Sequence, residues 1–198
     1  KFFSKFGLDV SKKLILYEPF GDRYIPENEN DKYILEILSE FDLNILVRLP
    51  PTDTVNLNDF KSQKADVVFH NTVARFQKGG RKLSDITRED DEDLINSLSF
   101  SALVVTGHST ISVDAVFFDR PAIVIGFAAK PRNYWASVRR FFDYDYLAPL
   151  VRAKGIRMAR SPEELREFLK NYLENPSLDR EARRFIAKRQ AQFLDGAS

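Results

Sequence analysis

The chain has 198 residues, of which 43% are hydrophobic, and it carries 30 lysines and arginines against 29 acidic residues. This near balance excludes the strongly basic surface by which a protein binds nucleic acid or anionic membranes without selectivity, so we expect no nucleic-acid partner. The absence of cysteine excludes disulfides, thiolate metal sites and cysteine nucleophiles.

The length of the chain is sufficient for one substantial hydrophobic core, and we expect a single domain over residues 1–198. The chain begins with Lys1-Phe2-Phe3-Ser4, without an initiator methionine or a signal-peptide pattern. No apolar run reaches the roughly 20 residues that a membrane-spanning helix needs. We therefore expect the chain to be part of a longer polypeptide.

Six short apolar runs have the length of β-strands. The first four lack clean polar alternation and are rich in Val, Ile and Leu, which is typical of strands covered on both faces. In chain order the six runs are 14–17, 44–47, 65–69, 102–105, 122–125 and 156–159.

Segments with the apolar spacing of an α-helix alternate with these runs. The spacing predicts helices over 30–41, 90–99, 162–174 and 179–194. Thr87 and Ser161 are the expected N-caps of two of them. The acidic run at 90–93 interacts favourably with a helix N-terminus, and we predict no metal there. The alternation predicts an α/β fold, namely a three-layer α/β/α Rossmann-like domain with a mostly parallel sheet of about six strands.

The last predicted helix, over 179–194, has an apolar and a basic face. We expect Phe185 and Ile186 to be buried on the apolar face, with Arg183 and other basic residues on the outer face.

Ligands of open parallel sheets bind beyond the carboxyl ends of the strands, where loops converge with helix N-termini. The fourth run leads into the loop Gly107-His108-Ser109-Thr110 and then into a helix. Gly107 permits a sharp turn and the close approach of a ligand, while the two hydroxyls lie beside the free N–H groups of the first helical turn. The loop predicts a diphosphate cradle. Alternatively, Ser109 is only an N-cap and His108 a surface histidine.

Three residues near this loop are further candidates. Arg48 follows the second run and could contact a phosphate, or it is an exposed arginine at the rim. Gly21 could bring backbone toward the ligand, or it belongs to a simple turn. Asp114 could accept hydrogen bonds from ribose or sugar hydroxyls, or it only offsets the helix dipole.

The segment 126–153 is aromatic and basic and lacks a clear period, as long functional loops often do. Its cations and stacking surfaces suit a nucleotide, although a helix packed against a partner domain would look the same. The residues concerned are Lys130, Arg132, Tyr134, Trp135, Arg139 and Arg140.

His70, at the end of the third run, is interpreted as a buried, hydrogen-bonded histidine rather than a base. The sequence contains no G-x-S-x-G motif, no Walker loop and no nucleophile–base–carboxylate pattern. Hydrolase chemistry therefore has little support.

Residues 101–115, followed by Phe118-Asp119-Arg120-Pro121-Ala122-Ile123, form a strand, a Ser-Thr-rich turn, a helix and a second strand. This order resembles the C-terminal domains of bacterial GT-B glycosyltransferases and of CDP-glycerol glycerophosphotransferase-like proteins. The resemblance extends over most of the chain, from Phe6-Gly7-Leu8-Asp9 through 161–165 to Leu194-Asp195-Gly196.

The resemblance implies a donor domain for polysaccharide biosynthesis that forms half of an active site. In such proteins this domain holds the activated donor, and the N-terminal domain across the cleft supplies the acceptor and the usual base. Carried over, it implies a nucleotide-sugar site with no cofactor and no metal, to which Gly21, Arg48, Gly107, His108, Ser109, Thr110 and Asp114 contribute. His108 would stabilise the leaving group.

The resemblance also implies partners and a location. We expect an N-terminal domain of the same polypeptide, contacted by residues 178–198, and a cytoplasmic protein, peripheral to the inner face of the membrane. An alternative is a CDP-glycerol-type glycerophosphotransferase, and another is a degenerate module that binds nucleotide, or only its partner domain, without catalysis.

Two departures from the family pattern bear on the chemistry. Relatives often carry Arg-x-His-Pro after the second strand, whereas this chain reads Arg48-Leu49-Pro50-Pro51. Relatives also tend to have a histidine where Tyr146 stands. Either the donor differs or the chemistry has drifted, and His108 would then supply a compensating imidazole.

Overall fold

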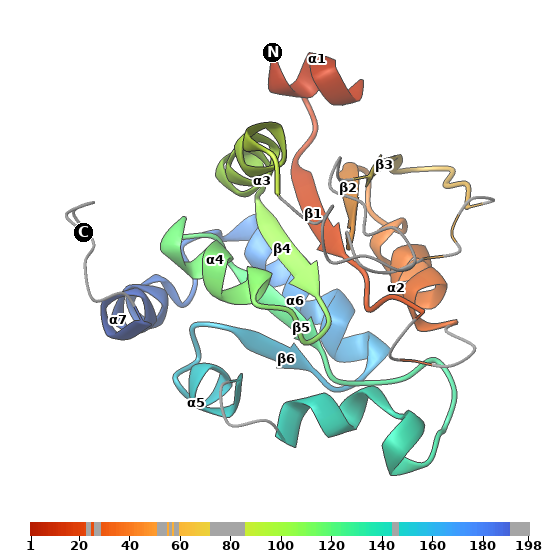
Figure 1. The fold of residues 1–198 in the computed structure, drawn as a ribbon, viewed down its shortest axis with the longest axis vertical. Helices are drawn as coiled ribbons and strands as arrows, with labels where there is room; N and C mark the ends of the chain where they lie inside the picture. The colour runs from red at the N-terminus through yellow and green to blue at the C-terminus, as the bar shows by residue number, and fades with distance from the viewer. Residues whose placement is uncertain are drawn as a thin grey trace.

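The computed structural model describes residues 1–22, 25, 29–50, 55, 57, 60–71, 86–143 and 147–190. These residues contain a six-stranded sheet in the order β3-β2-β1-β4-β5-β6, and all of the strand pairs are parallel (Figure 1). The strands are β1 (Leu14–Glu18), β2 (Asn44–Leu49), β3 (Asp66–Asn71), β4 (Leu103–Thr106), β5 (Ala122–Ile125) and β6 (Arg157–Ala159). Each of the six predicted strands is present, with ends shifted by at most two residues.

The strand order reverses direction between β1 and β4. The chain first adds β2 and β3 on one side of β1, then returns to pair β4 with the other side and continues outward to β6. In an open parallel sheet, such a reversal leaves a crevice at the carboxyl ends of the two central strands, because the following connections diverge to opposite faces. The loops after Glu18 and Thr106 lie at this point.

Helices cover both faces of the sheet, which confirms the three-layer α/β/α arrangement. One core joins Ile15, Tyr17 and Val105 to α2 and α6. The second core joins Leu16 and Val104 to α1, α3, α4, α5 and α7. The helices are α1 (Phe2–Phe6), α2 (Asn30–Leu38), α3 (Arg88–Phe100), α4 (Ile111–Phe117), α5 (Leu147–Arg152), α6 (Pro162–Glu174) and α7 (Arg180–Gln190).

The predicted caps of α3 and α6 are confirmed. Thr87 Oγ1 accepts a hydrogen bond from the Asp90 N–H, while the Asp90 carboxylate accepts one from the Thr87 N–H, forming a complete capping box. Ser161 accepts from the Glu164 N–H in the same way. Helix α2 ends at Leu38, earlier than predicted, but Phe41 still packs on the core from the turn that follows.

Two residues of helix α7 differ in burial from the prediction. Arg183 is fully buried, whereas Phe185 is 53% exposed. The guanidinium of Arg183 donates to Asp119 and to the carbonyl oxygens of Pro176 and Leu178, so its burial is compensated by hydrogen bonds. The part of the predicted helix beyond Gln190, and the residues Leu194-Asp195-Gly196, lie outside the described residues.

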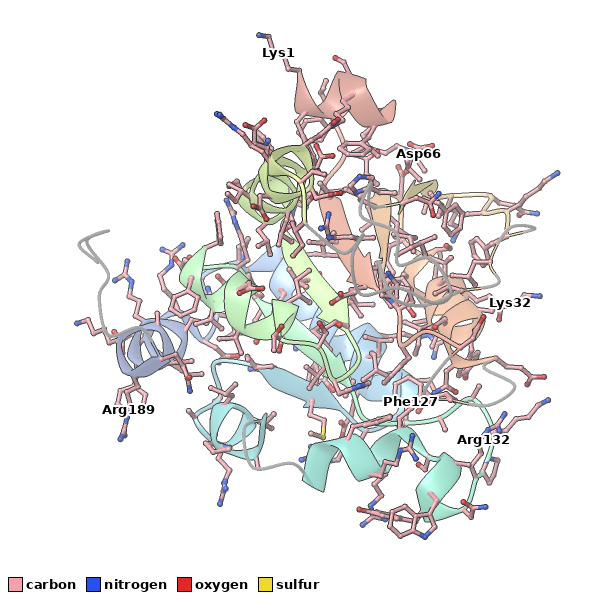
Figure 2. The ribbon with its side chains drawn as sticks, in the orientation of Figure 1. Lys1, Lys32, Asp66, Phe127, Arg132 and Arg189 are labelled. Carbon is pink, nitrogen blue, oxygen red and sulfur yellow. The ribbon has the colours of Figure 1, made fainter. Side chains whose placement is uncertain are left out.

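The segment after β5 forms two short 3₁₀ helices, η2 (Tyr134–Ala136) and η3 (Val138–Asp143), before α5. Figure 2 shows Phe127 and Arg132 at the end of the molecule opposite Lys1, and Phe127 is buried in the core. Trp135 is 75% exposed. None of the described helices has the length and apolar character needed to cross a membrane.

Candidate functional site

The two loops of the switch point are packed against each other through Gly107 and Phe20. A Cβ atom at Gly107 would lie 2.5 Å from the Phe20 ring. The sequence suggested that the missing side chain of Gly107 admits a ligand. In the structure the space beside its Cα is filled by Phe20, and the glycine is required for contact between the loops.

The loop after β1 is held by an internal carboxylate. Asp31, in the first turn of α2, accepts hydrogen bonds from the N–H groups of Phe20 at 2.8 Å and Gly21 at 3.0 Å. It also accepts one from the Tyr17 hydroxyl at 2.9 Å. Gly21 itself has a φ of 83°, which favours glycine. Its N–H is directed to Asp31, and a contact between the Gly21 backbone and a ligand stays a prediction.

His108 is stacked between aromatic rings. Its imidazole lies parallel to the Phe141 ring, with centroids 3.8 Å apart and 6° between the planes, and it faces Phe20 at 6.1 Å. The Arg140 guanidinium lies over the other side of the stack, 4.6 Å from the Phe141 centroid. Burial, reinforced by Arg140, lowers the pKa of His108 to about 4. The ring is therefore neutral at pH 7 and offers one N–H donor and one acceptor rather than a positive charge.

The hydroxyl groups of the Ser-Thr turn have different surroundings. Ser109 Oγ accepts a hydrogen bond from the Ile111 N–H at 3.3 Å, and its hydroxyl interacts with the Glu18 carboxylate. Thr110 occupies the N-cap position of α4 and is exposed, and its side chain makes no capping hydrogen bond to the described residues. Ser109 thus accepts a hydrogen bond from a helix N–H, as an N-cap would, although Thr110 occupies the N-cap position. The Thr110 side chain is exposed to solvent.

A row of polar side chains crosses the carboxyl ends of four neighbouring strands. Glu18 of β1 is in register with Thr106 of β4, and Arg48 of β2 with His70 of β3. The register of β1 and β2 pairs Tyr17 with Val47, which places Glu18 beside Arg48. Since strand side chains alternate between faces, the four residues project to the face that carries α3 and α4. Arg48, Ser109 and Asp114 are thereby gathered around Glu18, whose charge interacts with all three.

Glu18 was not identified from the sequence. It is the last residue of an apolar run, and its position next to Thr106 follows only from the pairing of β1 with β4, which no local pattern gives. Thr106 Oγ1 lies 3.5 Å from Glu18 Oε2. A charged residue that ends a buried strand on the carboxyl edge is the signal that could have found it.

In this row of side chains, burial and neighbouring opposite charges shift the pKa values in opposite directions. Burial lowers the pKa of Arg48, and the carboxylates of Glu18, Asp90 and Asp93 raise it, so the guanidinium stays charged. Its Nη1 atom is buried and has no hydrogen-bond partner among the described residues. Burial alone raises the pKa of Asp114, which is half-buried.

His70 is buried, as the sequence analysis expected. Its Nε2 lies 3.3 Å from Asp93 Oδ2, and Asp93 also accepts hydrogen bonds from Lys5 of α1 at 2.7 and 2.8 Å. Burial, and then the charge of Arg48, lower the pKa of His70. Its Nδ1 has no partner among the described residues. The cluster ties α1 and α3 to the sheet edge.

Two described residues of the aromatic and basic segment lie at the site. Phe141 and Arg140 lie against His108. Lys130 instead forms an ion pair with Glu29, 2.6 Å away, at the start of α2. Of the two positions at which the chain departs from its relatives, Pro50 directly follows β2 and is half-buried, whereas Tyr146 lies outside the described residues.

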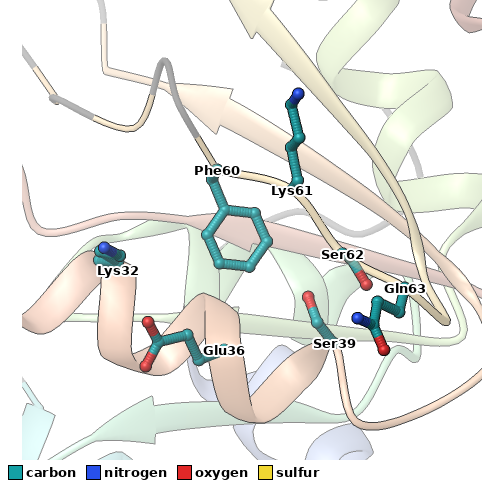
Figure 3. A pocket seen from close by; sticks show the side chains of 7 residues that line it. All are labelled: Lys32, Glu36, Ser39, Phe60, Lys61, Ser62 and Gln63. Carbon is teal, nitrogen blue, oxygen red and sulfur yellow. The ribbon is translucent and has the colours of Figure 1, made fainter.

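A hollow of about 360 Å³ lies elsewhere, between α2 and the segment that precedes β3 (Figure 3). None of its lining residues belongs to the loops of the switch point, so it is separate from the candidate site. The residues that line it are Lys32, Glu36, Ser39, Phe60, Lys61, Ser62 and Gln63.

No protein-family model and no curated protein sequence matches the chain. Among solved structures, the wall teichoic acid polymerase TagF superposes with a TM-score of 0.54 and 16% identity, over 93% of this chain and 41% of TagF. A histidine-to-asparagine variant of TagF gives a TM-score of 0.57 and 16% identity, over 98% of this chain and 43% of TagF. A histidine-to-alanine variant gives 0.54 and 18%, over 98% and 42%.

The chain therefore spans about two fifths of the length of the solved structures that it matches. At such low identity the likeness concerns the fold. It agrees with the resemblance seen in the sequence: this chain has the fold of one domain of a GT-B-type glycosyltransferase.

Proposed function

We propose that this chain is the donor-binding domain of a transferase that uses a nucleoside-diphosphate-activated donor, with a nucleotide sugar as the first candidate. The acceptor would be held by an N-terminal domain of the same polypeptide. The proposal rests on one observation above all. The Ser-Thr turn at the start of α4 lies at the switch point of the sheet. On the same edge lies the Nη1 atom of Arg48, which is buried and has no hydrogen-bond partner among the described residues.

Each part of this edge can contribute to binding a diphosphate. The Thr110 hydroxyl is exposed and makes no capping hydrogen bond to the described residues, so it could donate to a phosphate oxygen. Arg48 supplies a positive charge that four carboxylates keep in its ionised form. Asp114, one turn into α4, would accept a hydrogen bond from a ribose or sugar hydroxyl.

Catalysis by this half of the site would consist of stabilising the leaving group. As the bond to the donor phosphate breaks, negative charge grows on the departing phosphate oxygen, and N–H groups, hydroxyls and Arg48 would stabilise it. His108 would act as a neutral donor of one hydrogen bond, because its imidazole is unprotonated at pH 7. The base that activates the acceptor would come from the N-terminal domain.

A second candidate is a CDP-glycerol-type glycerophosphotransferase. It is favoured by the likeness to TagF, a wall teichoic acid polymerase, one of whose structures comes from a crystal soaked with CDPG and superposes with a TM-score of 0.50 and 17% identity. The same edge would then bind the two phosphates, but the acceptor would attack the phosphate that carries the glycerol, and the nucleoside monophosphate would leave.

Calorimetric titration with UDP, CDP and GDP and with the matching monophosphates tests the proposal. We expect one diphosphate to bind more tightly than its monophosphate, with no need for magnesium, because the turn and Arg48 contact the second phosphate. Preference for a cytidine nucleotide would favour the second candidate. If no nucleotide binds to this chain or to the full-length polypeptide, the domain is an interaction module and the proposal is wrong.

A further inference from the structure

Glu18 occupies the centre of the candidate site, at the carboxyl end of β1. Its half-buried carboxylate interacts with the Ser109 hydroxyl and lies 3.5 Å from Thr106 Oγ1. No lysine, arginine or histidine among the described residues lies within ion-pair distance of it. Arg48 is the cation whose charge reaches it. The carboxylate is thus held mainly by neutral hydroxyls.

A phosphate bound at the Ser-Thr turn would bring a second negative charge to Glu18. Both anions would compete for the single Ser109 hydroxyl proton, and both would lie in partly buried surroundings where screening by water is weak. Two carboxylates or a carboxylate and a phosphate that share a site relieve this repulsion when one of them takes up a proton.

We propose that Glu18 is a binding residue that takes up a proton when the diphosphate of the donor enters the Ser109 turn, and that it releases this proton when the diphosphate leaves. Protonated, Glu18 donates a hydrogen bond instead of competing for one, and the Ser109 hydroxyl becomes available to the phosphate. This inference rests on the proposed function and makes donor affinity fall as pH rises.

The groups around Glu18 favour this assignment. Burial raises the pKa of Glu18 above its ordinary 4.5, Ser109, Arg48 and Thr106 act in the opposite direction, and Asp114 of α4 raises it further. The charge of Arg48, which lowers the pKa of Glu18, also interacts with the carboxylates of Asp90, Asp91 and Asp93 in α3. Lys5 of α1 and His70 of β3 contact Asp93 rather than Glu18.

The sign of the effect follows from the two pKa values of Glu18. The free domain has a raised pKa, and a bound diphosphate raises it again. Between these two values, binding takes up a proton, so affinity rises as pH falls, by at most about tenfold per pH unit. Below both values the carboxyl is protonated in either state, and above both it is ionised in either state, so affinity levels off.

The test uses CDP-glycerol and UDP-glucose as probes, because both of their phosphates are diesters that do not titrate near neutral pH. Binding to the full-length polypeptide is measured by calorimetry from about pH 5 to about pH 8 in two buffers of different ionisation enthalpy. For the probe that binds, we expect proton uptake of up to one per site in the wild-type protein. This measurement needs no variant, so it decides the question even if substitutions disturb folding.

The variant Glu18→Gln assigns the proton. It should abolish the uptake, flatten the pH profile and bind more tightly than wild type at the alkaline end. Glu36→Gln, the same change at an exposed position of α2, should behave as wild type. Uptake that persists in Glu18→Gln would move the proton to another group such as His108 and overturn the inference. Binding without uptake at every pH would also overturn it, whereas failure of both probes to bind would overturn the proposed function itself.

Discussion

At the scale of single residues, removing the two hydroxyls of the Ser-Thr turn distinguishes a role in ligand binding from a role in helix capping. The double change Ser109→Ala and Thr110→Ala should weaken diphosphate binding by about 1–3 kcal/mol, because hydrogen bonds to charged oxygens are lost. Calorimetric titration measures this. Ser99→Ala, which removes a hydroxyl that bonds only within α3 in the described structure, is the matched control. Unchanged affinity in the double variant would exclude these two residues from the site.

The stacked imidazole of His108 predicts a dependence of stability on pH. Its pKa is about 4 in the folded domain against an ordinary 6.5, so the unfolded chain takes up the proton first. Stability from this group is complete above about pH 6.5 and is lost as pH falls toward 4, on the order of 1–3 kcal/mol in total. His108→Phe keeps the ring contact but cannot titrate. Urea unfolding at neutral and acidic pH should show a smaller decline for this variant, and equal declines would contradict the prediction.

Contact between the two loops makes Gly107 sensitive to any side chain. Gly107→Ala should destabilise the domain by about 1–3 kcal/mol, because its Cβ would lie 2.5 Å from the Phe20 ring. The double variant Gly107→Ala with Phe20→Leu should recover part of this loss, since the smaller side chain makes room. Thermal unfolding measures both. If the double variant lost the sum of the two single effects, the contact would not be the cause.

Some residue roles could be predicted from the sequence and others could not. The turn of Ser109 and Thr110 was predictable, because the hydroxyls precede the helix directly in the chain. The contacts of Gly21 and Gly107 could not be predicted, since each is made with a residue that is distant in sequence, Asp31 in one case and Phe20 in the other. The local sequence predicts that a glycine is needed at a position, but it does not predict which distant residue contacts it.

At the scale of elements, the buried guanidinium of Arg183 ties α7 to the turn that follows α4. Arg183→Ala should destabilise the domain by about 1–3 kcal/mol, because two carbonyl oxygens lose this donor and Asp119, which keeps its ion pair with Arg180, loses one of its partners. Arg184→Ala, at the exposed neighbouring position, should change stability by no more than about 0.5 kcal/mol. Chemical denaturation compares the two. Similar small effects would show that the buried contact contributes little.

The elements themselves were predictable, but the orientation of α7 was not. Strands β1, β2 and β5 each contain an uninterrupted apolar run, and α6 has a capping serine, an N-terminal proline and a regular apolar stripe, so the local signals agree with one another. In α7, Arg183 was predicted to lie on the outer face because arginine side chains are usually exposed to solvent. Asp119 and the carbonyl groups that offset its burial belong to other segments of the chain.

At the scale of the whole molecule, the strand order decides where a site can form. The apolar runs predict parallel strands but do not specify that β4 pairs with β1, and this pairing alone brings Glu18 to Thr106. The likeness to TagF, over 98% of this chain at 16% identity for one variant, shows that patterning conserves the fold where individual side chains differ.

The carboxylate of Asp31 has a consequence for how the crevice responds to a ligand. It accepts hydrogen bonds from the amides of Phe20 and Gly21 and so fixes the loop after β1. In the proposed site, this wall of the crevice would already be ordered before a donor binds. At the start of α4, the Thr110 hydroxyl is exposed and makes no capping hydrogen bond in the described structure. In the proposed site, the loop after β1 would therefore be a fixed wall, and the Thr110 hydroxyl would remain to meet the incoming phosphates.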